Sequence, residues 1–100
     1  MYKKYLINKE NIIAHELNGL KVKAIKSCDK NKEGMRGKVI KETKNTLVIE
    51  EKEGEEKILP KKEADLEFLV GGKKISVEGR NLVGKPEERI KLFFRRKKNG

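Results

Sequence analysis

The chain has a single cysteine, a single histidine, no tryptophan and no glutamine among its 100 residues. With Cys28 as the only thiol, an intramolecular disulfide is excluded, and Cys28 and His15 together cannot supply a Cys/His zinc site. We expect Cys28 to be a small buried hydrophobe in a reducing cytoplasm. The absence of glutamine and the many lysines and glutamates favour a heat-adapted source organism.

Long hydrophobic runs are also missing. No apolar stretch approaches the roughly 20 residues that span a bilayer, and no signal-peptide pattern opens the chain. We therefore expect a soluble cytoplasmic protein with no membrane partner. Aromatic residues are scarce, and they do not form the interleaved stripe on which single-stranded bases stack, which favours recognition of the shape and backbone of a folded RNA.

Catalytic patterns are absent as well. The sequence has no Ser/His/Asp set, no Walker loop and no HxH or DxD constellation. His15 beside Glu16 is the one acid–base pair, and we interpret it as a structural or interface contact. The sequence therefore predicts a chain with no catalytic residues, no metal site and no bound cofactor of its own.

Positive charge is what the chain has in excess. Lysine and arginine number 26 against 16 aspartates and glutamates, which gives a formal net charge of +10. On so small a domain this excess favours a polyanionic partner, most often nucleic acid, over a merely soluble surface. The acidic group at residues 50–56 is the exception, and its hairpin should point away from nucleic acid because phosphates would be repelled there.

The candidate RNA-binding residues lie in the first arm of a predicted hairpin, at residue 80 and in the C-terminal segment. They are Arg36, Lys38, Lys41, Arg80, Lys85, Arg89, Lys91, Arg95 and Arg96. Arg36, Arg80 and Arg89 are the best phosphate candidates, because a guanidinium group can bind two phosphate oxygens at a fixed geometry.

Alternating apolar residues predict six short strands. A central hairpin has arms at 37–43 and 46–51 joined by a two-residue turn, Lys44-Asn45, in which asparagine tolerates positive φ. Four further strands are expected at 20–28, 56–59, 64–70 and around 75–77. Gly34 and Gly37 bracket the start of the hairpin, where a missing Cβ permits a tight bend or a close backbone approach.

These strands predict an all-β fold: a small, strongly bent, antiparallel six-stranded barrel of the Sm-like or SH3-like type, because closure hides strand edges. The barrel should span residues 20–79. Residues 1–19 read as an arm and a short helix with Asn8 as N-cap and Gly19 as its stop. Residues 80–100 form a basic segment in which Pro86 favours a helix, although residues 87–96 also alternate as a strand would.

Apolar residues near the N-terminus either pack on their own domain or form a docking surface for another protein. Tyr2, Tyr5, Leu6 and Ile7 form the upstream group that could dock a protein, whereas Ile13 and Leu17 share a helical face that more often packs on its own domain.

Four segments, in this order and spacing, resemble archaeal ribonuclease P protein component 1, the counterpart of the eukaryotic twenty-nine-kilodalton ribonuclease P subunit. They are His15-Glu16-Leu17-Asn18-Gly19-Leu20, Gly34-Met35-Arg36-Gly37, Glu42-Thr43-Lys44-Asn45-Thr46-Leu47 and Leu82-Val83-Gly84-Lys85-Pro86-Glu87-Glu88-Arg89. The resemblance covers about residues 12 to 91. Two positions depart from the family pattern, since Asn18 stands where an apolar residue is usual and Lys85 where arginine is common.

The resemblance implies an Sm-like twisted barrel with helical extensions that binds ribonuclease P RNA. It also implies pairing with a small zinc-ribbon subunit and other ribonuclease P proteins, and only indirect contact with precursor tRNA. The holoenzyme removes the 5′ leader of precursor tRNA, while the RNA and its Mg²⁺ ions perform the hydrolysis. By this resemblance Arg36, Lys38, Arg80 and Arg89 would face RNA. The same resemblance implies that the protein partner is contacted by Tyr5, Leu6, Ile12, Ile13 and Leu17. Three alternatives stay open: a ribosomal-type SH3-like barrel that binds rRNA, a protein–protein adaptor and a standalone nuclease.

Overall fold

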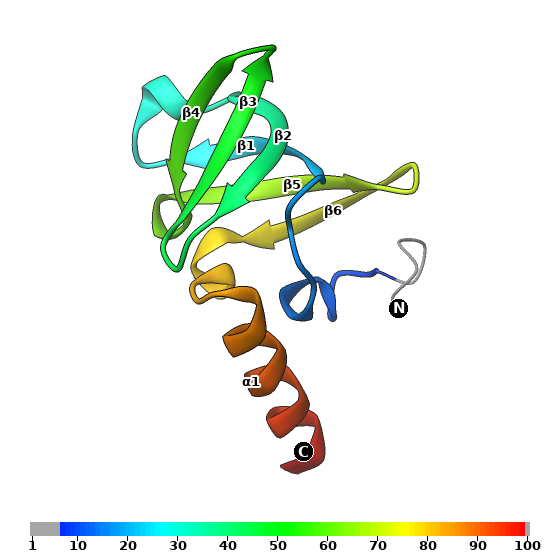
Figure 1. Ribbon diagram of the computed structural model, residues 1–100. Coiled ribbons are helices and arrows are strands. Elements are labelled where there is room, and N and C mark those ends of the chain that lie inside the picture. Colours follow the sequence, from blue (N-terminus) through cyan, green and yellow to red (C-terminus); the bar gives the residue numbers. More distant parts are fainter. Residues whose placement is uncertain (1–6, 100) are drawn as a thin grey trace.

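The computed structural model describes residues 7–99, with the side chains of residues 7–95. Six antiparallel strands form one sheet in the order β4-β3-β2-β1-β5-β6. Their bounds are β1 Lys21–Ser27, β2 Arg36–Glu42, β3 Thr46–Lys52, β4 Glu55–Pro60, β5 Ala64–Val70 and β6 Lys73–Glu78. Short 3₁₀ turns are η2 Ile12–Ala14, η3 Lys30–Lys32, η4 Lys61–Glu63 and η5 Gly79–Leu82, and the helix α1 spans Pro86–Asn99. The sheet is strongly twisted, and α1 runs away from it (Figure 1).

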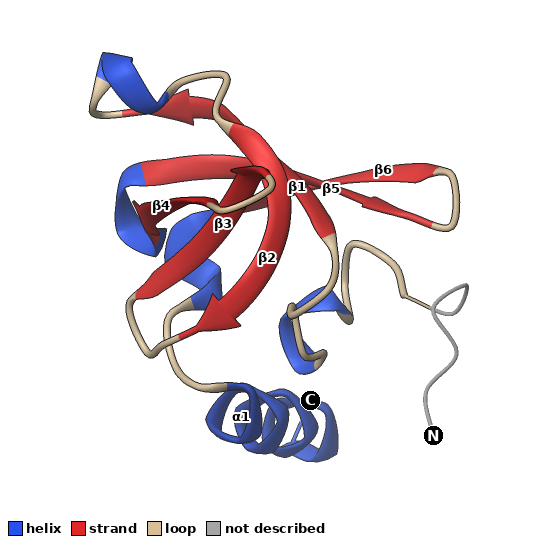
Figure 2. Ribbon diagram, turned by 45° about the horizontal axis from the view of Figure 1, so that its top comes forward, coloured by secondary structure: helices blue, strands red, loops and turns tan. Residues whose placement is uncertain are grey.

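The predicted all-β fold with six antiparallel strands is confirmed, but the sheet does not close into a barrel. β4 and β6 are its two edges, and no ladder joins them among the described strands. The β5–β6 hairpin projects sideways from the rest of the sheet, which keeps β6 away from β4 (Figure 2). Both edges carry charged residues, and β4 ends in a proline, which protects exposed edges from unwanted pairing.

One face of the sheet carries the core. Val39, Leu47 and Ile49, which the sequence places on a shared inward face, are all fully buried. Leu66 and Phe68 of β5 are buried beside them. Burial of each such side chain stabilises the fold by about 1.5–3 kcal/mol relative to exposure. The core is therefore built mainly by the strands, as the alternating pattern predicts.

Two glycines act at the start of the hairpin as expected. Gly34 has a φ of 84°, a backbone conformation that side chains disfavour. A Cβ on Gly37 would lie 2.2 Å from the carbonyl oxygen of Glu50, so only glycine allows β2 to approach β3 this closely. The two-residue turn is present, since the Thr43 N–H donates to the Thr46 carbonyl at 3.0 Å across Lys44-Asn45. The expected positive φ of Asn45 is not observed, because no described residue other than glycine has positive φ. The Thr46 N–H donates to Thr43 Oγ1 at 3.0 Å, so a threonine side chain supports the turn.

The prediction that Cys28 is buried is wrong, because β1 contains a bulge. Cys28 is exposed. The register of β1 against β5 shifts between Ala24 and Lys26. The inserted residue reverses the alternation, so Ser27 turns inward with 7% exposure and Cys28 turns outward.

The predicted N-terminal helix is also shorter than expected. Only the 3₁₀ turn η2 forms, and the chain from His15 to Gly19 is not helical. The N-cap of η2 is Asn11 rather than the predicted Asn8. The Asn8 Oδ1 instead accepts from the N–H groups of Glu10 and Asn11 in the turn before η2, each at 2.9 Å. The predicted C-terminal helix is confirmed, and its strand alternative is excluded.

Candidate nucleic-acid interface

Most of the predicted RNA-binding side chains are exposed, and they divide between two elements. β2 carries three of them (Arg36, Lys38 and Lys41), while Lys85 precedes α1 and Lys91 and Arg95 lie one turn apart on α1 itself. The side chain of Arg96 lies outside the described residues.

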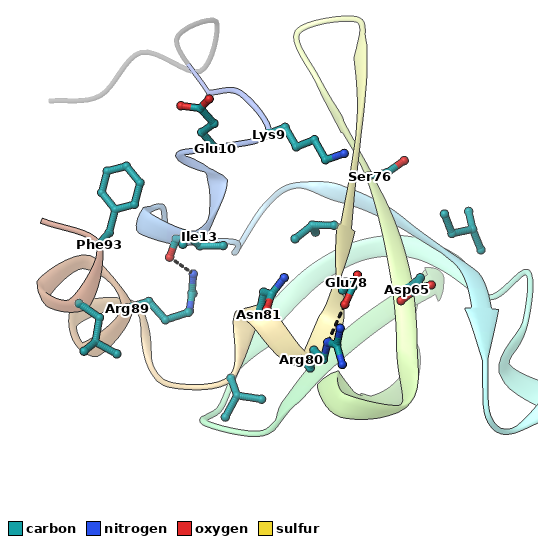
Figure 3. A pocket seen from close by; sticks show the side chains of 14 residues that line it. Lys9, Glu10, Ile13, Asp65, Ser76, Glu78, Arg80, Asn81, Arg89 and Phe93 are labelled. Atoms are coloured by element: carbon teal, nitrogen blue, oxygen red, sulfur yellow. Dashed lines mark hydrogen bonds and ion pairs between the residues drawn. The ribbon is translucent and has the colours of Figure 1, made fainter. Parts of the chain in front are cut away.

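Arg80 is exposed but already has an anionic partner. Its Nε donates to Glu78 Oε2 at 2.6 Å, with 72% and 50% of the two side chains exposed. The pair lies at the rim of a groove between η2, η5 and α1 (Figure 3). A neutralising carboxylate makes Arg80 a weaker phosphate site than its charge alone suggests.

The prediction that Arg89 contacts phosphate is wrong, because Arg89 is buried with 3% of its surface exposed. Its Nη2 donates to Glu42 Oε2 at 2.5 Å, and its Nε to the Gly84 carbonyl at 3.2 Å. Its Nη1 donates to the carbonyls of Ile13 at 2.7 Å and His15 at 3.2 Å. The guanidinium group therefore joins α1 to η2 and β2 rather than facing solvent.

Lys61 completes the same buried network. It is fully buried, and its Nζ donates to Glu42 Oε2 at 2.7 Å and to the carbonyls of Thr43, Lys44 and Gly84 at 2.8–3.2 Å. Burial lowers the pKa of Lys61, and the hydrogen bond to Glu42 opposes that shift. Burial and the charge of Arg89 also lower the pKa of His15. We call Glu42, Lys61 and Arg89 the buried charge network.

A bulge in β2 creates this network, and no sequence pattern indicated it. The register of β2 against β3 shifts between Val39 and Lys41. Without this register shift, Glu42 would point outward. With the shift, Glu42 points inward, and only 1% of its side chain is exposed. Lys61 directly follows Pro60, where the sequence indicates only a break in the ladder. The carboxylate and the two cations thus come from three separate segments that meet only in the folded chain.

The predicted protein-partner residues are corrected in part. Ile12 and Leu17 are fully buried in the core, so they cannot form an interface. Ile13 is half-buried and lines the groove of Figure 3, a cavity of about 560 Å³. Tyr5 and Leu6 lie outside the described residues.

Exposed apolar side chains near that groove come from α1 and from β1, where Ile25 is 44% exposed. Leu92 is 46% exposed and Phe94 is 51% exposed, while Phe93 lines the groove and packs edge-on against Phe94 with ring centroids 5.5 Å apart. The helix α1 therefore presents unburied apolar surface on this side of the molecule.

A second groove, of about 500 Å³, opens on the outer face of β1 and β2. We call it the basic groove; its charged lining consists of Lys21, Lys23, Arg36, Lys38 and Lys74 with Glu50, Glu51 and Glu67. Arg36 and Lys38 were predicted from the sequence as RNA-binding residues, whereas Lys21, Lys23 and Lys74 were not. The outward positions of the first strand were visible in the sequence, but the register that brings them against β2 was not.

Within residues 7–95, no group of three or more histidine, cysteine, aspartate or glutamate side chains is arranged to hold a metal ion. No helix in the described part of the chain is both long and apolar enough to cross a bilayer.

Comparison with known proteins gives one consistent family. Residues 10–92 match the family described as ribonuclease P/MRP, subunit p29. Ribonuclease P protein component 1 of Methanocaldococcus jannaschii is 48% identical over 86 residues, covering 86% of this chain and 90% of that protein. Its counterpart in Methanothermobacter thermautotrophicus is 42% identical over 92 residues, covering 91% of this chain and 99% of that protein.

A solved structure agrees with the sequence comparisons. It is described as Mth11, a homologue of the human RNase P protein Rpp29, and it is 43% identical with a TM-score of 0.57, covering 76% of this chain and 99% of that one. The resemblance noted in the four sequence segments is thus confirmed, and the chain belongs to the ribonuclease P/MRP subunit p29 family.

Proposed function

We propose that this chain is the RNA-binding component of a ribonuclease P holoenzyme and stabilises the catalytic RNA for removal of the 5′ leader from precursor tRNA. The family match over residues 10–92 carries the proposal, and it favours ribonuclease P RNA over rRNA. The net charge of +10 is consistent with a polyanionic partner.

The protein's contribution is electrostatic. Crowded phosphates repel one another in a compact RNA fold, and cationic side chains relieve that repulsion. Arg36, Lys38 and Lys41 on β2 and Lys91 and Arg95 on α1 are exposed and suited to this role. The chain supplies no catalytic residue and binds no cofactor; RNA-bound Mg²⁺ ions perform the hydrolysis in the cytoplasm, and precursor tRNA is contacted only indirectly.

A small zinc-ribbon subunit of ribonuclease P is the proposed protein partner. The exposed apolar side chains Leu92 and Phe94, next to the groove lined by Ile13 and Phe93, support docking at α1 and the N-terminal segment. Apolar surface of this kind is typical of protein interaction sites.

The experiment is a Mg²⁺ titration of precursor-tRNA cleavage by the cognate ribonuclease P RNA, with and without this chain and the zinc-ribbon subunit. We expect the proteins to lower the Mg²⁺ concentration that half-maximal cleavage requires, because they replace part of the ion atmosphere. An unchanged Mg²⁺ requirement would contradict the proposal and favour the ribosomal alternative. Cleavage by the purified chain without RNA would contradict the absence of catalytic residues.

A further inference from the structure

We propose that the basic groove is the site that binds the phosphates of a folded RNA, with Lys21 and Lys23 of β1 and Arg36 and Lys38 of β2 as its central contacts. This inference rests on the proposed function and assigns it to one face of the sheet.

The strand register carries the argument. Lys21 lies directly opposite Lys38, and Lys23 lies directly opposite Arg36. Cross-strand neighbours have Cβ atoms only about 5 Å apart, and like charges placed so are destabilising. Two such pairs lie next to each other on one face. A sheet face that serves only solubility gains nothing from this arrangement, whereas a polyanion would relieve the repulsion.

The described chain neutralises the centre of this face only in part. None of its four cations has a carboxylate oxygen within 4.0 Å among the described residues, although Lys30, Lys32 and Arg80 elsewhere on the surface each do. Two of the cations have a carboxylate directly opposite on their other side, Glu50 for Lys38 and Glu67 for Lys23. Lys21 and Arg36 have no described carboxylate directly opposite them, so this face keeps a surplus of positive charge.

The shape of the groove suits a phosphate chain. Residues i and i+2 of a strand lie about 6.8 Å apart, so the cations form a regular grid rather than a single cluster. Gly37, between Arg36 and Lys38, allows β3 to approach closely and form one wall. Glu50 and Glu51 on that wall repel phosphates and direct the RNA toward β1, β5 and Lys74. The acidic hairpin thus limits the site on one side.

The test compares Lys21→Thr/Lys23→Thr with wild type for two properties that should change in opposite directions. Relief of the like-charge pairs should raise the melting temperature of the free protein by about 2–5 °C, helped by the β propensity of threonine. Binding to the cognate ribonuclease P RNA should weaken, and the slope of log K against log salt should become shallower by about 1.5 for two lost contacts. Lys57→Thr is the matched control: Lys57 is an exposed strand lysine in the acidic hairpin, and its loss should leave RNA affinity unchanged.

The outcomes separate this inference from the proposed function. If the double variant binds RNA as tightly and with the same salt slope as wild type, the groove assignment is overturned while the RNA-binding role stands. If wild type itself shows no salt-dependent binding to ribonuclease P RNA, the proposed function fails with it. If Lys57→Thr weakens binding as much as the double variant, binding depends on net charge alone and the site is refuted.

Glu51→Gln gives an independent check, because removing a carboxylate from the wall should tighten RNA binding. Affinity that is unchanged or weaker would contradict the assigned path of the RNA.

Discussion

Glu42 is a carboxylate in the interior of a strongly basic protein. Its Oε2 accepts hydrogen bonds from both Lys61 and Arg89, so one negative charge is shared by two positive ones. Buried ion pairs give little net stability compared with apolar packing, but losing one partner is costly because the remaining charges stay buried without compensation. The buried charges therefore compensate one another only when β2, η4 and α1 are packed in this one arrangement.

Replacement Glu42→Gln should lower the free energy of unfolding by about 3–5 kcal/mol, since it leaves two buried cations without an anion. Urea denaturation of the variant and wild type measures the difference. Glu56→Gln serves as the control, because Glu56 is exposed on β4 opposite Glu50 and its change should stay within about 0.5 kcal/mol. Equal stability of Glu42→Gln and wild type would show that the network does not hold these elements together.

His15 should make stability depend on pH. Burial and Arg89 lower its pKa below the ordinary 6.5, so on acidification the unfolded chain takes up a proton before the folded chain does. Its contribution is therefore fully present above about pH 6.5 and is lost as the pH falls through the lowered folded-state pKa.

Thermal unfolding at about pH 7.5 and about pH 5.5 tests this expectation. Wild type should lose more stability between the two conditions than His15→Asn, because carboxylates that titrate in the same range contribute equally to both proteins. A loss of equal size in the two proteins would exclude a buried, pKa-shifted histidine.

At the scale of elements, two bulges decide which side chains point inward. The bulge in β1 turns Ser27 in and Cys28 out, and the bulge in β2 turns Glu42 in. Each one reverses the alternation by a single residue. The positions of the strands thus follow from the alternating order of apolar residues. Which side chains point inward after a bulge depends on the register with the partner strand.

α1 is the element most exposed to a partner. Phe94→Ser should reduce recovery of the zinc-ribbon subunit in a pull-down while changing the free energy of unfolding by less than about 0.5 kcal/mol, because Phe94 is already 51% exposed. Ile58→Ser is the matched control, since Ile58 is a 61% exposed apolar residue on β4 that does not line the groove beside α1. Unaltered recovery with Phe94→Ser would count against docking at α1.

At the scale of the whole molecule, the surface charge and the core have opposite effects on folding stability. The net charge of +10 destabilises a compact chain by self-repulsion, and a bound polyanion would offset that repulsion. The core and the buried charge network hold the fold against this repulsion. The exposed cations of β1, β2 and α1 are then free for RNA.

RNA affinity should therefore fall steeply when salt is raised from about 50 to about 200 mM, because each phosphate contact releases counterions. Filter binding or fluorescence anisotropy across this range gives the slope. A flat response would favour the adaptor alternative. Arg89→Ala should reduce folding stability rather than the slope, since Arg89 has no exposed group to offer a phosphate.

The amino-acid order alone determined the strands, the C-terminal helix, the inward face of the central hairpin and the family. These features depend on local alternation, on capping and turn residues, and on short segments in a fixed order. Tyr5 and Leu6 as partner contacts and Arg96 as an RNA contact stay predictions, because their side chains lie outside the described residues.

Only the tertiary structure decided that Arg89 and Lys61 are buried and that Ile12 and Leu17 belong to the core. It also decided that Lys21 of β1 lies opposite Lys38 of the neighbouring strand β2. Each depends on which segments meet and in what register, and a shift of one residue exchanges the inside and outside of a strand. A lysine destined for the interior and a lysine destined for RNA look the same in the sequence, because the difference lies in the neighbours that folding brings to them.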